Sequence, residues 1–353
     1  MKICVQKQSA VVALMVASTA CVEQRTSPPV PVVALGPALG AIPVGNEPHV
    51  LELNDGRVAI TMMGLGALVV HDFASGRSDT IGRRGAGPGE FGRAGRVVPW
   101  GRDRFAVLDP LLRRVAVFHN AGGVDTMIRF PVATTTEAAI PHVSGVWLTP
   151  GGDLVRDSVP LLRVAAAAGG PDTLALIGEP PRHFLRLGSV GLNLAAEYAP
   201  RDRFGLLPDG RVWIARGHDN RIDWVAPNGD LTRGRPRAFP VIGTVSGDRH
   251  RLEGLPAPPI LDTVGRELAP TKAPFQDVLA GPAGELWFWL NQPHGYSAEL
   301  YEVRAPNGLE RVRVSLPGAH KLVAIGNVHV YMLGEDATGD WVLTRRMKPA
   351  AAR

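Results

Sequence analysis

The sequence has 353 residues, of which 45% are hydrophobic and 20% are charged, so the chain can bury a large core and is neither disordered nor a polytopic membrane protein. Glycine and proline together make up about a fifth of the residues, whereas 6% are aromatic, a balance that indicates many turns and few long helices. The formal net charge of +5 comes from basic residues scattered along the chain, which is typical of a solvated surface and gives no support to a nucleic-acid interface.

Residues 1–20 have the pattern of a bacterial export signal. Lys2 and Lys7 form a positive n-region, and residues 10–17 (AVVALMVA) form an apolar segment that is too short to span a bilayer. The sequence therefore predicts that the chain is exported and that this segment is removed.

The end of the signal contains a possible lipidation site. Residues 18–21 (STAC) resemble a bacterial lipobox, in which small residues precede a cysteine that is cleaved and lipidated. Ser18 departs from the pattern, because that position usually carries leucine or another aliphatic residue, so ordinary signal-peptidase cleavage stays an alternative. We predict that Cys21 is the lipidated residue.

The rest of this region is consistent with a lipid-anchored protein. Cys4, the other cysteine of the chain, lies inside the signal, so lipidation of Cys21 leaves no free thiol for a disulfide, a metal site or a nucleophile. Val22 follows the cysteine where inner-membrane lipoproteins carry aspartate, and this resemblance implies the outer membrane. Residues 21–30 are predicted to be a polar tether, and the lipid is the only membrane attachment that we expect.

From residue 31 onward the pattern is that of strands. Apolar runs of about four to seven residues alternate with turns rich in glycine, proline, asparagine and aspartate. A degenerate repeat of three or four strands with x-[DN]-G turns occurs six times, at residues 50–76, 96–123, 145–165, 204–229, 277–308 and 322–344. Units of about 40 residues suit the blades of a propeller. We therefore predict an all-β, six-bladed β-propeller over residues 31–348, with a short tail at residues 349–353.

Three segments have particular places in this prediction. The sixth repeat lacks a fourth strand, and the apolar residues 31–35 (PVVAL) are predicted to complete it, so that an N-terminal strand closes the last blade. Residues 82–95 (GRRGAGPGEFGRAG) are interpreted as a crossing between blades, because no helix follows them to form a phosphate-binding turn. Residues 241–275 do not match the repeat and are interpreted as an inter-blade insertion on one face of the ring, with a functional lid as the alternative.

Two repeats contain a more specific motif. Residues 109–118 (DPLLRRVAVF) and 219–229 (DNRIDWVAPNG) resemble NHL-type blades, in which an aspartate ends one strand and an arginine five residues later opens the next. Arg216 stands where the second copy would carry that aspartate. The resemblance implies a six-bladed propeller of the NHL or TolB-like type, in which Asp109 pairs with Arg114 or accepts backbone N–H bonds; it implies no activity, because this fold hosts many functions.

No catalytic residue and no metal ligand is assigned, because hydrolase-elbow, helical zinc and EF-hand motifs are absent from the sequence. The candidate binding residues are polar residues in the links between strands, where we expect the mouth of the central channel: Arg84, Arg114, Arg216, His218, Asp219, Asn220, Arg221, Asn291 and His294. Polar residues in such links also cap strands and turns, which is the competing interpretation of each.

The sequence thus predicts a surface-tethered lipoprotein that binds a protein, peptide or carbohydrate ligand at the channel mouth, without enzymatic activity, cofactor or nucleic acid. One alternative is a metal-dependent hydrolase or lactonase. The resemblance to gluconolactonase- and paraoxonase-type propellers would then imply a divalent cation such as calcium at the axis, held by oxygen ligands from different blades. Another alternative is a scaffold for envelope assembly. Whether the chain is an enzyme stays open at this point.

Overall fold

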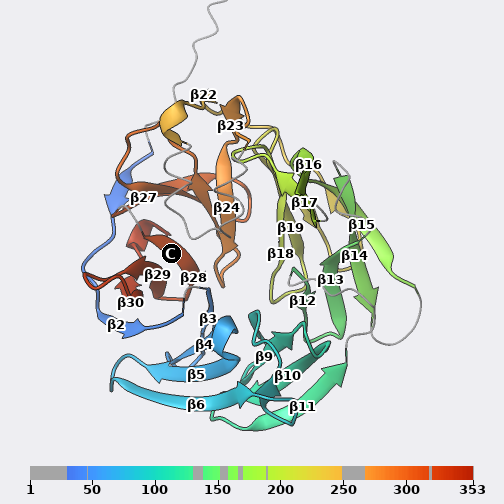
Figure 1. Cartoon of the computed structure of the whole chain (residues 1–353), viewed down its shortest axis with the longest axis vertical. Coiled ribbons are helices and arrows are strands. Elements are labelled where there is room, and N and C mark those ends of the chain that lie inside the picture. The colour runs from blue at the N-terminus through green and yellow to red at the C-terminus, as the bar shows by residue number, and fades with distance from the viewer. Residues whose placement is uncertain are drawn as a thin grey trace, which may run out of the picture.

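The computed structural model describes residues 30–45, 47–129, 138–151, 158–165, 170–187, 190–248, 267–317 and 320–352. It confirms the predicted fold class: six antiparallel sheets stand around a common axis as the blades of a propeller (Figure 1). Within the described ranges, no helix is long and apolar enough to cross a membrane.

The first three blades follow one another along the chain. Blade 1 contains β3 (Pro48–Glu52), β4 (Val58–Met62), β5 (Ala67–Asp72), β6 (Arg77–Arg84) and the short β7 (Glu90–Phe91), which runs parallel to β6. Blade 2 contains β8 (Val97–Pro99), β9 (Arg104–Asp109), β10 (Arg114–His119) and β11 (Val124–Arg129). Blade 3 contains β12 (Ile140–Pro141), β13 (Val146–Pro150), β14 (Ser158–Ala165) and β15 (Asp172–Gly178).

The other three blades complete the ring. Blade 4 contains β18 (Arg203–Leu206), β19 (Val212–Arg216), β20 (Arg221–Val225) and β21 (Leu231–Thr232). Blade 5 contains β24 (Phe275–Ala280), β25 (Leu286–Leu290), β26 (Glu299–Arg304) and β27 (Glu310–Leu316). Blade 6 contains β28 (Lys321–Ile325), β29 (His329–Glu335) and β30 (Trp341–Met347). The first strand of each blade is the innermost one, and neighbouring first strands contact each other, as β28 contacts β3 and β18 contacts β24.

An N-terminal strand closes the last blade, as predicted, but it is not the strand that the sequence indicated. β2 (Gly40–Pro43) pairs antiparallel with β30 and supplies the fourth strand of blade 6. The predicted residues 31–35 contain β1 (Val32–Ala34), which pairs parallel with β27 and gives blade 5 a fifth strand. Each segment covers an open sheet edge and packs on the adjacent core, Val33 beside blade 5 and Ile42 beside blade 6.

The cores lie between neighbouring blades. Both faces of each sheet are covered, so the middle strands are nearly continuous apolar runs, and buried side chains fill the spaces on either side. Trp147 is 1% exposed and Trp287 is fully buried at such positions. Polar contacts also join blades: the Tyr331 hydroxyl of blade 6 donates to Glu52 Oε2 of blade 1 at 2.6 Å, and Lys348 pairs with Glu285 of blade 5.

The Gly-rich residues 82–95 lead from blade 1 to blade 2 as predicted, although residues 82–84 end β6 and residues 90–91 form β7 of blade 1. Arg114 holds this crossing in place, because its guanidinium donates to the carbonyl oxygens of Ala86, Gly87 and Glu90 at 2.8, 3.0 and 2.7 Å. The backbone at Gly85 has a φ of +156°, and a Cβ atom there would lie 2.2 Å from Glu90 Oε2. The glycines therefore serve the tight path of the chain.

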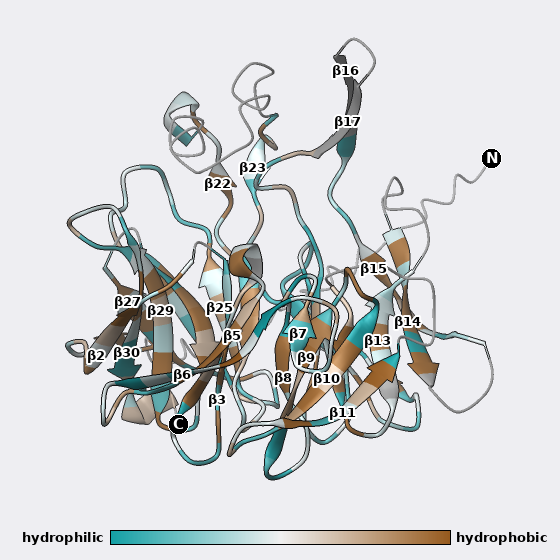
Figure 2. Cartoon of the chain, turned by 60° about the horizontal axis from the view of Figure 1, so that its bottom comes forward, coloured by the Kyte–Doolittle hydropathy of each residue, from teal (hydrophilic) through white to brown (hydrophobic). Residues whose placement is uncertain are grey.

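The two faces of the ring differ. Because strand direction alternates within a blade, the links into first strands and the links between second and third strands lie on the same face. Two hairpins stand on the links into blades 4 and 5: β16 (Arg182–Leu187) with β17 (Val190–Ala195), and β22 (Ile242–Gly243) with β23 (Thr271–Lys272). They project from this face, which we call the hairpin face (Figure 2). The predicted insertion at 241–275 includes β22 and β23, and its residues 249–266 lie outside the described residues.

Candidate functional site at the propeller axis

Basic side chains gather around the axis on the hairpin face. They lie at the beginning of first strands or just before them, where the chain comes in from that face. We call this group the axial cluster; its members are His49 in β3, Arg93 and Arg96 before β8, Arg201 and Arg203 at the start of β18, and Lys321 at the start of β28. Although these residues are up to 272 positions apart in the sequence, the ring brings their strands together.

His49 is the histidine of the cluster, and its surroundings favour the neutral imidazole. Burial, followed by the positive charges of Arg96, Lys321 and Arg93, lowers its pKa from 6.5 to about 4. Each of these factors opposes the imidazolium form. His49 is therefore neutral at pH 7, in the middle of a group of cations.

Arg96 carries a buried donor, its Nε, that lacks a hydrogen-bond partner among the described residues. Burial lowers the pKa of Arg96, and the charge of Asp277 opposes this effect. The guanidinium stays charged at physiological pH, because no arginine loses its proton in this range.

Carboxylates near the axial cluster offset only part of its positive charge. Asp277 lies 2.9 Å from Arg203 Nε, and Arg203 Nη2 also donates to the Gln276 carbonyl at 2.6 Å. Burial and the nearby Arg203 lower the pKa of Arg201, whereas Glu179 and Glu197 raise it. The described part of the axis therefore has more cations than carboxylates, an arrangement that attracts anions.

The structure brings the candidate residues of blade 4 together, although as a network of ion pairs. Arg216 pairs with Asp202 and with Asp223, each at 2.7 Å. Arg221 pairs with Asp223 at 2.9 Å and with Asp219. The charged groups of this link therefore already have partners.

Two further candidates belong to the same link of blade 4. Asn220 is buried with a φ of 55°, and its side-chain oxygen accepts from Arg304 Nη2 of blade 5 at 2.6 Å. His218, by contrast, is exposed on the link. Asn220 therefore joins two blades, whereas His218 is open to solvent.

The remaining candidates do not join this network. Arg84 is exposed at the end of β6 in blade 1, and Arg114 holds the Gly-rich crossing. Asn291 is buried and donates to the Ala273 carbonyl at 2.8 Å, while the half-exposed His294 lies 3.6 Å from Asp248. Cys21 lies outside the described residues.

Asp109 has the role that the NHL-type resemblance implied. It is fully buried, and its carboxylate accepts from the backbone N–H groups of Gly92, Arg93 and Leu112 at 2.8, 3.2 and 3.0 Å. Arg114 lies 4.0 Å away. Asp109 is thus a structural residue that holds the link into blade 2, the link that carries Arg93 and Arg96.

Sequence reasoning missed the axial cluster itself. Arg96 opens the second predicted repeat, and Arg203 and Lys321 come directly before the fourth and sixth, but none of the three is among the predicted binding residues. A signal was present, because a basic residue comes at or directly before the first strand in blades 2, 4 and 6. Its meaning depends on knowing that these strands surround one axis.

The described residues at the axis do not supply a divalent-cation site. Calcium requires several convergent oxygen ligands, whereas Asp277 here is paired with Arg203 and the neighbouring side chains are cations. Elsewhere in the described ranges, no group of three His, Cys, Asp or Glu side chains is placed to hold a metal ion. These residues therefore do not fit the cation of the hydrolase alternative.

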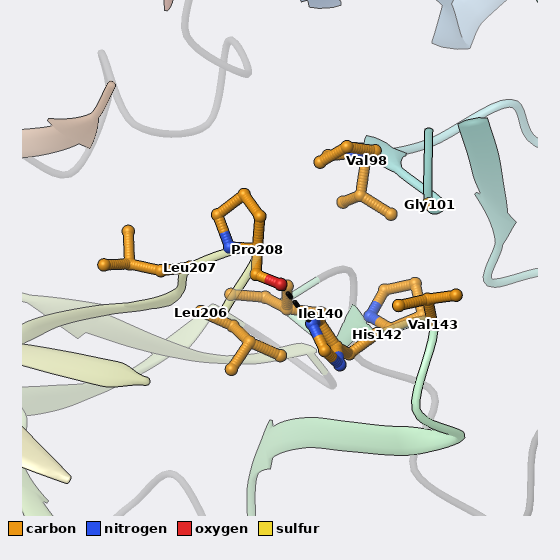
Figure 3. Close-up of a pocket in the computed structure, with 10 residues that line it drawn as sticks. Val98, Gly101, Ile140, His142, Val143, Leu206, Leu207 and Pro208 are labelled. Carbon is orange, nitrogen blue, oxygen red and sulfur yellow. Dashed lines mark hydrogen bonds between the residues drawn. The ribbon is translucent and has the colours of Figure 1, made fainter. Parts of the chain in front are cut away.

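A pocket lies at the opposite face, between blades 2, 3 and 4 (Figure 3). It has a volume of about 260 Å³ and is lined mainly by aliphatic residues and prolines, including Val98, Ile140 and Leu206. His142 is the only polar side chain among its ten lining residues, and its ring nitrogens bond to Ser144 Oγ at 2.8 Å and the Pro208 carbonyl at 3.2 Å. Its lining is therefore mainly apolar, in contrast to the charged axial cluster.

Solved structures share this architecture. A protein of Bacteroides fragilis that bears the description "exported protein" is 13% identical, covers 87% of this chain and 92% of its own, and has a TM-score of 0.50. Virginiamycin B lyase from Staphylococcus aureus is 10% identical over 88% and 99% of the two chains, with a TM-score of 0.42. A calcium-binding protein, regucalcin from Agrobacterium tumefaciens, is 13% identical over 90% and 97%, with a TM-score of 0.44.

No protein-family model and no curated protein sequence matches the chain. At these low identities, the solved structures are similar to it in backbone arrangement. The similarity to the Bacteroides fragilis protein supports the propeller fold and shows nothing more about this chain.

Proposed function

We propose that this chain is an exported, lipid-anchored propeller that binds an anionic ligand at its axis on the hairpin face, without catalysing a reaction. The gathering of cations from different blades in the axial cluster is the observation that carries this proposal. Guanidinium groups bind carboxylate, phosphate and sulfate through charge-assisted hydrogen bonds. The ligand is then a protein, peptide or carbohydrate that presents such a group.

The tether fits this assignment of the ligand-binding face. β1 runs parallel to β27, and β27 leads from the opposite face toward the hairpin face. The described chain therefore approaches β1 from the side opposite the axial cluster. A lipid at Cys21, nine residues before the described chain begins, would leave the hairpin face open to the ligand.

The finer type of the propeller is also part of the proposal. The contacts of Asp109 and Arg114 support an NHL or TolB-like blade in the second repeat. In blade 4 the equivalent aspartate is replaced by Arg216, which makes its own ion pairs with Asp202 and Asp223. We therefore assign the chain to the NHL or TolB-like type. Blade 2 follows the aspartate–arginine pattern closely, and blade 4 carries an arginine in place of the aspartate.

Replacing Arg96 with glutamine is expected to weaken the binding of sulfate, inorganic phosphate and citrate at least tenfold. A hydrogen bond to a charged group contributes about 1.5–3 kcal/mol, and about 1.4 kcal/mol corresponds to tenfold in affinity. Isothermal titration calorimetry with each anion at low salt measures the change. Added sodium chloride should weaken binding to the wild type, because salt screens exposed charges.

The matched control for this experiment is Arg77→Gln on β6. The Arg77 side chain is 75% exposed and pairs with Asp79 at 3.0 Å, far from the first strands. This variant should bind the three anions as the wild type does. Failure of all three anions to bind the wild type, or equal binding by Arg96→Gln, would contradict the proposed function.

Replacing Cys21 with serine is expected to release the protein from the membrane fraction, because the acyl chains attach to the cysteine sulfur. Fractionation of cells and immunodetection of the soluble and membrane fractions measure the change. Cys4→Ser is the control, since Cys4 lies in the predicted signal and should leave the anchored protein in place. A Cys21→Ser form that stays entirely with the membrane would show that the anchor is not there.

A further inference from the structure

We propose that His49 contacts the anion bound at the axis and takes up one proton from solvent when that anion binds. The inference rests on the proposed function, since it concerns the same site. It adds a specificity residue and a dependence on pH that the charge of the cluster alone does not imply.

The position of His49 carries the inference. It is the second residue of β3, whose neighbouring first strands are β28 on one side and β8 on the other. Lys321 begins β28, and Arg93 and Arg96 lie directly before β8. The partly buried imidazole thus lies between cations that come from both sides of it.

In the free protein these cations keep the ring neutral. Protonation of His49 would add a positive charge to a partly buried group that already contains Arg93, Arg96 and Lys321. Burial and these three charges lower the pKa of His49 to about 4. His49 is the histidine of this set, and imidazole is the side chain whose ordinary pKa lies between pH 5 and 8.

A bound oxyanion would favour the protonated form of His49. Its negative charge offsets the cations, which raises the pKa of His49, and the imidazolium can donate both ring N–H groups. The proton comes from the buffer and goes to the imidazole, and no covalent bond of the ligand changes. Because the bound state holds more protons than the free state, affinity is highest at low pH and falls as pH rises through the pKa of the bound state.

Sulfate is the probe that isolates this effect, since its own charge is constant between pH 5 and 8. Titration of the full chain with sulfate in unbuffered solution at pH 6 should consume a fraction of a proton per site, measured with an indicator dye. The affinity should fall about threefold or more between pH 5.5 and 7.5, within the limit of tenfold per pH unit for one proton.

His49→Gln tests the residue directly. The variant should lose both the proton uptake and the pH dependence of sulfate binding, since an amide side chain does not titrate in this range. His119→Gln on β10, with a side chain that is 52% exposed, should keep both.

Each outcome decides between the two proposals. Sulfate binding without proton uptake overturns the role of His49 and leaves the anion site in place. Proton uptake that persists in His49→Gln also overturns that role. If sulfate does not bind the wild type at any of these pH values, both the role of His49 and the proposed function are wrong.

Discussion

Replacing Arg216 with methionine is expected to lower the free energy of unfolding by about 3–5 kcal/mol, the usual cost of breaking a buried ion pair from one side. Asp223 is fully buried and Asp202 is 7% exposed, and the variant leaves both without their contact to Arg216. Arg216 Nη1 also donates to the Leu176 carbonyl of blade 3 at 2.6 Å, so the loss extends across the blade interface. Guanidinium-induced unfolding of the full chain measures the difference.

Acid should reduce this difference. Burial acts to raise the pKa of Asp223, but hydrogen bonds from Arg216 and Arg221 outweigh it and hold the pKa below 3.8. When folding lowers the pKa of a carboxyl group, the ionised group stabilises the folded protein. This stabilisation is complete at a pH above the pKa of the unfolded chain, and it is lost as the pH falls through the pKa of the folded protein. The difference in the free energy of unfolding between the wild type and Arg216→Met should therefore shrink below about pH 3.8.

Arg77→Met is the control for Arg216→Met. Its exposed ion pair with Asp79 should change the free energy of unfolding by less than about 0.5 kcal/mol. Equal stability of wild type and Arg216→Met would mean that Arg221 and backbone donors alone hold the two buried carboxylates.

The Arg216 network also positions the axial cluster. Asp202 lies between Arg201 and Arg203, and its carboxylate accepts from the backbone N–H groups of Gly178 and Gly217 at 2.8 and 2.9 Å as well as from Arg216. This anchors the link that carries two members of the cluster. Arg216 thus helps to hold this link in place, and its predicted role in ligand binding stays a prediction.

Replacing Lys272 with methionine is expected to have a similarly large effect, about 3–5 kcal/mol. Lys272 is 3% exposed and donates to Asp248 Oδ1 at 2.6 Å and to the Gln292 carbonyl at 2.9 Å. Its ammonium group also lies 4.8 Å from the centre of the Tyr198 ring. The variant leaves the buried Asp248 without its cation and loosens the hairpin β22–β23 from blade 5.

The double variant Lys272→Met/Asp248→Leu is the control for this pair. Removing both charges should restore part of the lost stability, because a buried ion pair can be replaced by apolar side chains at little net cost. Hydrogen exchange at residues 242–248 and 271–273 locates the effect, and guanidinium-induced unfolding measures its size. A double variant that is less stable than Lys272→Met would contradict the assignment of the loss to an uncompensated Asp248.

The sequence determined the architecture of this protein because the signals for it are local. Short apolar runs, x-[DN]-G turns and a spacing of about 40 residues indicate strands and blades whatever the rest of the chain does. The role of Asp109 could be predicted for the same reason, since the groups that it binds or approaches all lie within 17 positions of it.

The tertiary structure alone decided which segments and side chains meet. Residues 32–34 and 40–43 are both short and apolar, and only the open edges of blades 5 and 6 select which of them closes the ring. His49, Arg96 and Lys321 have no local pattern in common, because closure of the ring, rather than proximity in the sequence, places their strands around one axis. The same closure surrounds a neutral histidine with cations, and this arrangement is the basis of the proposed anion site.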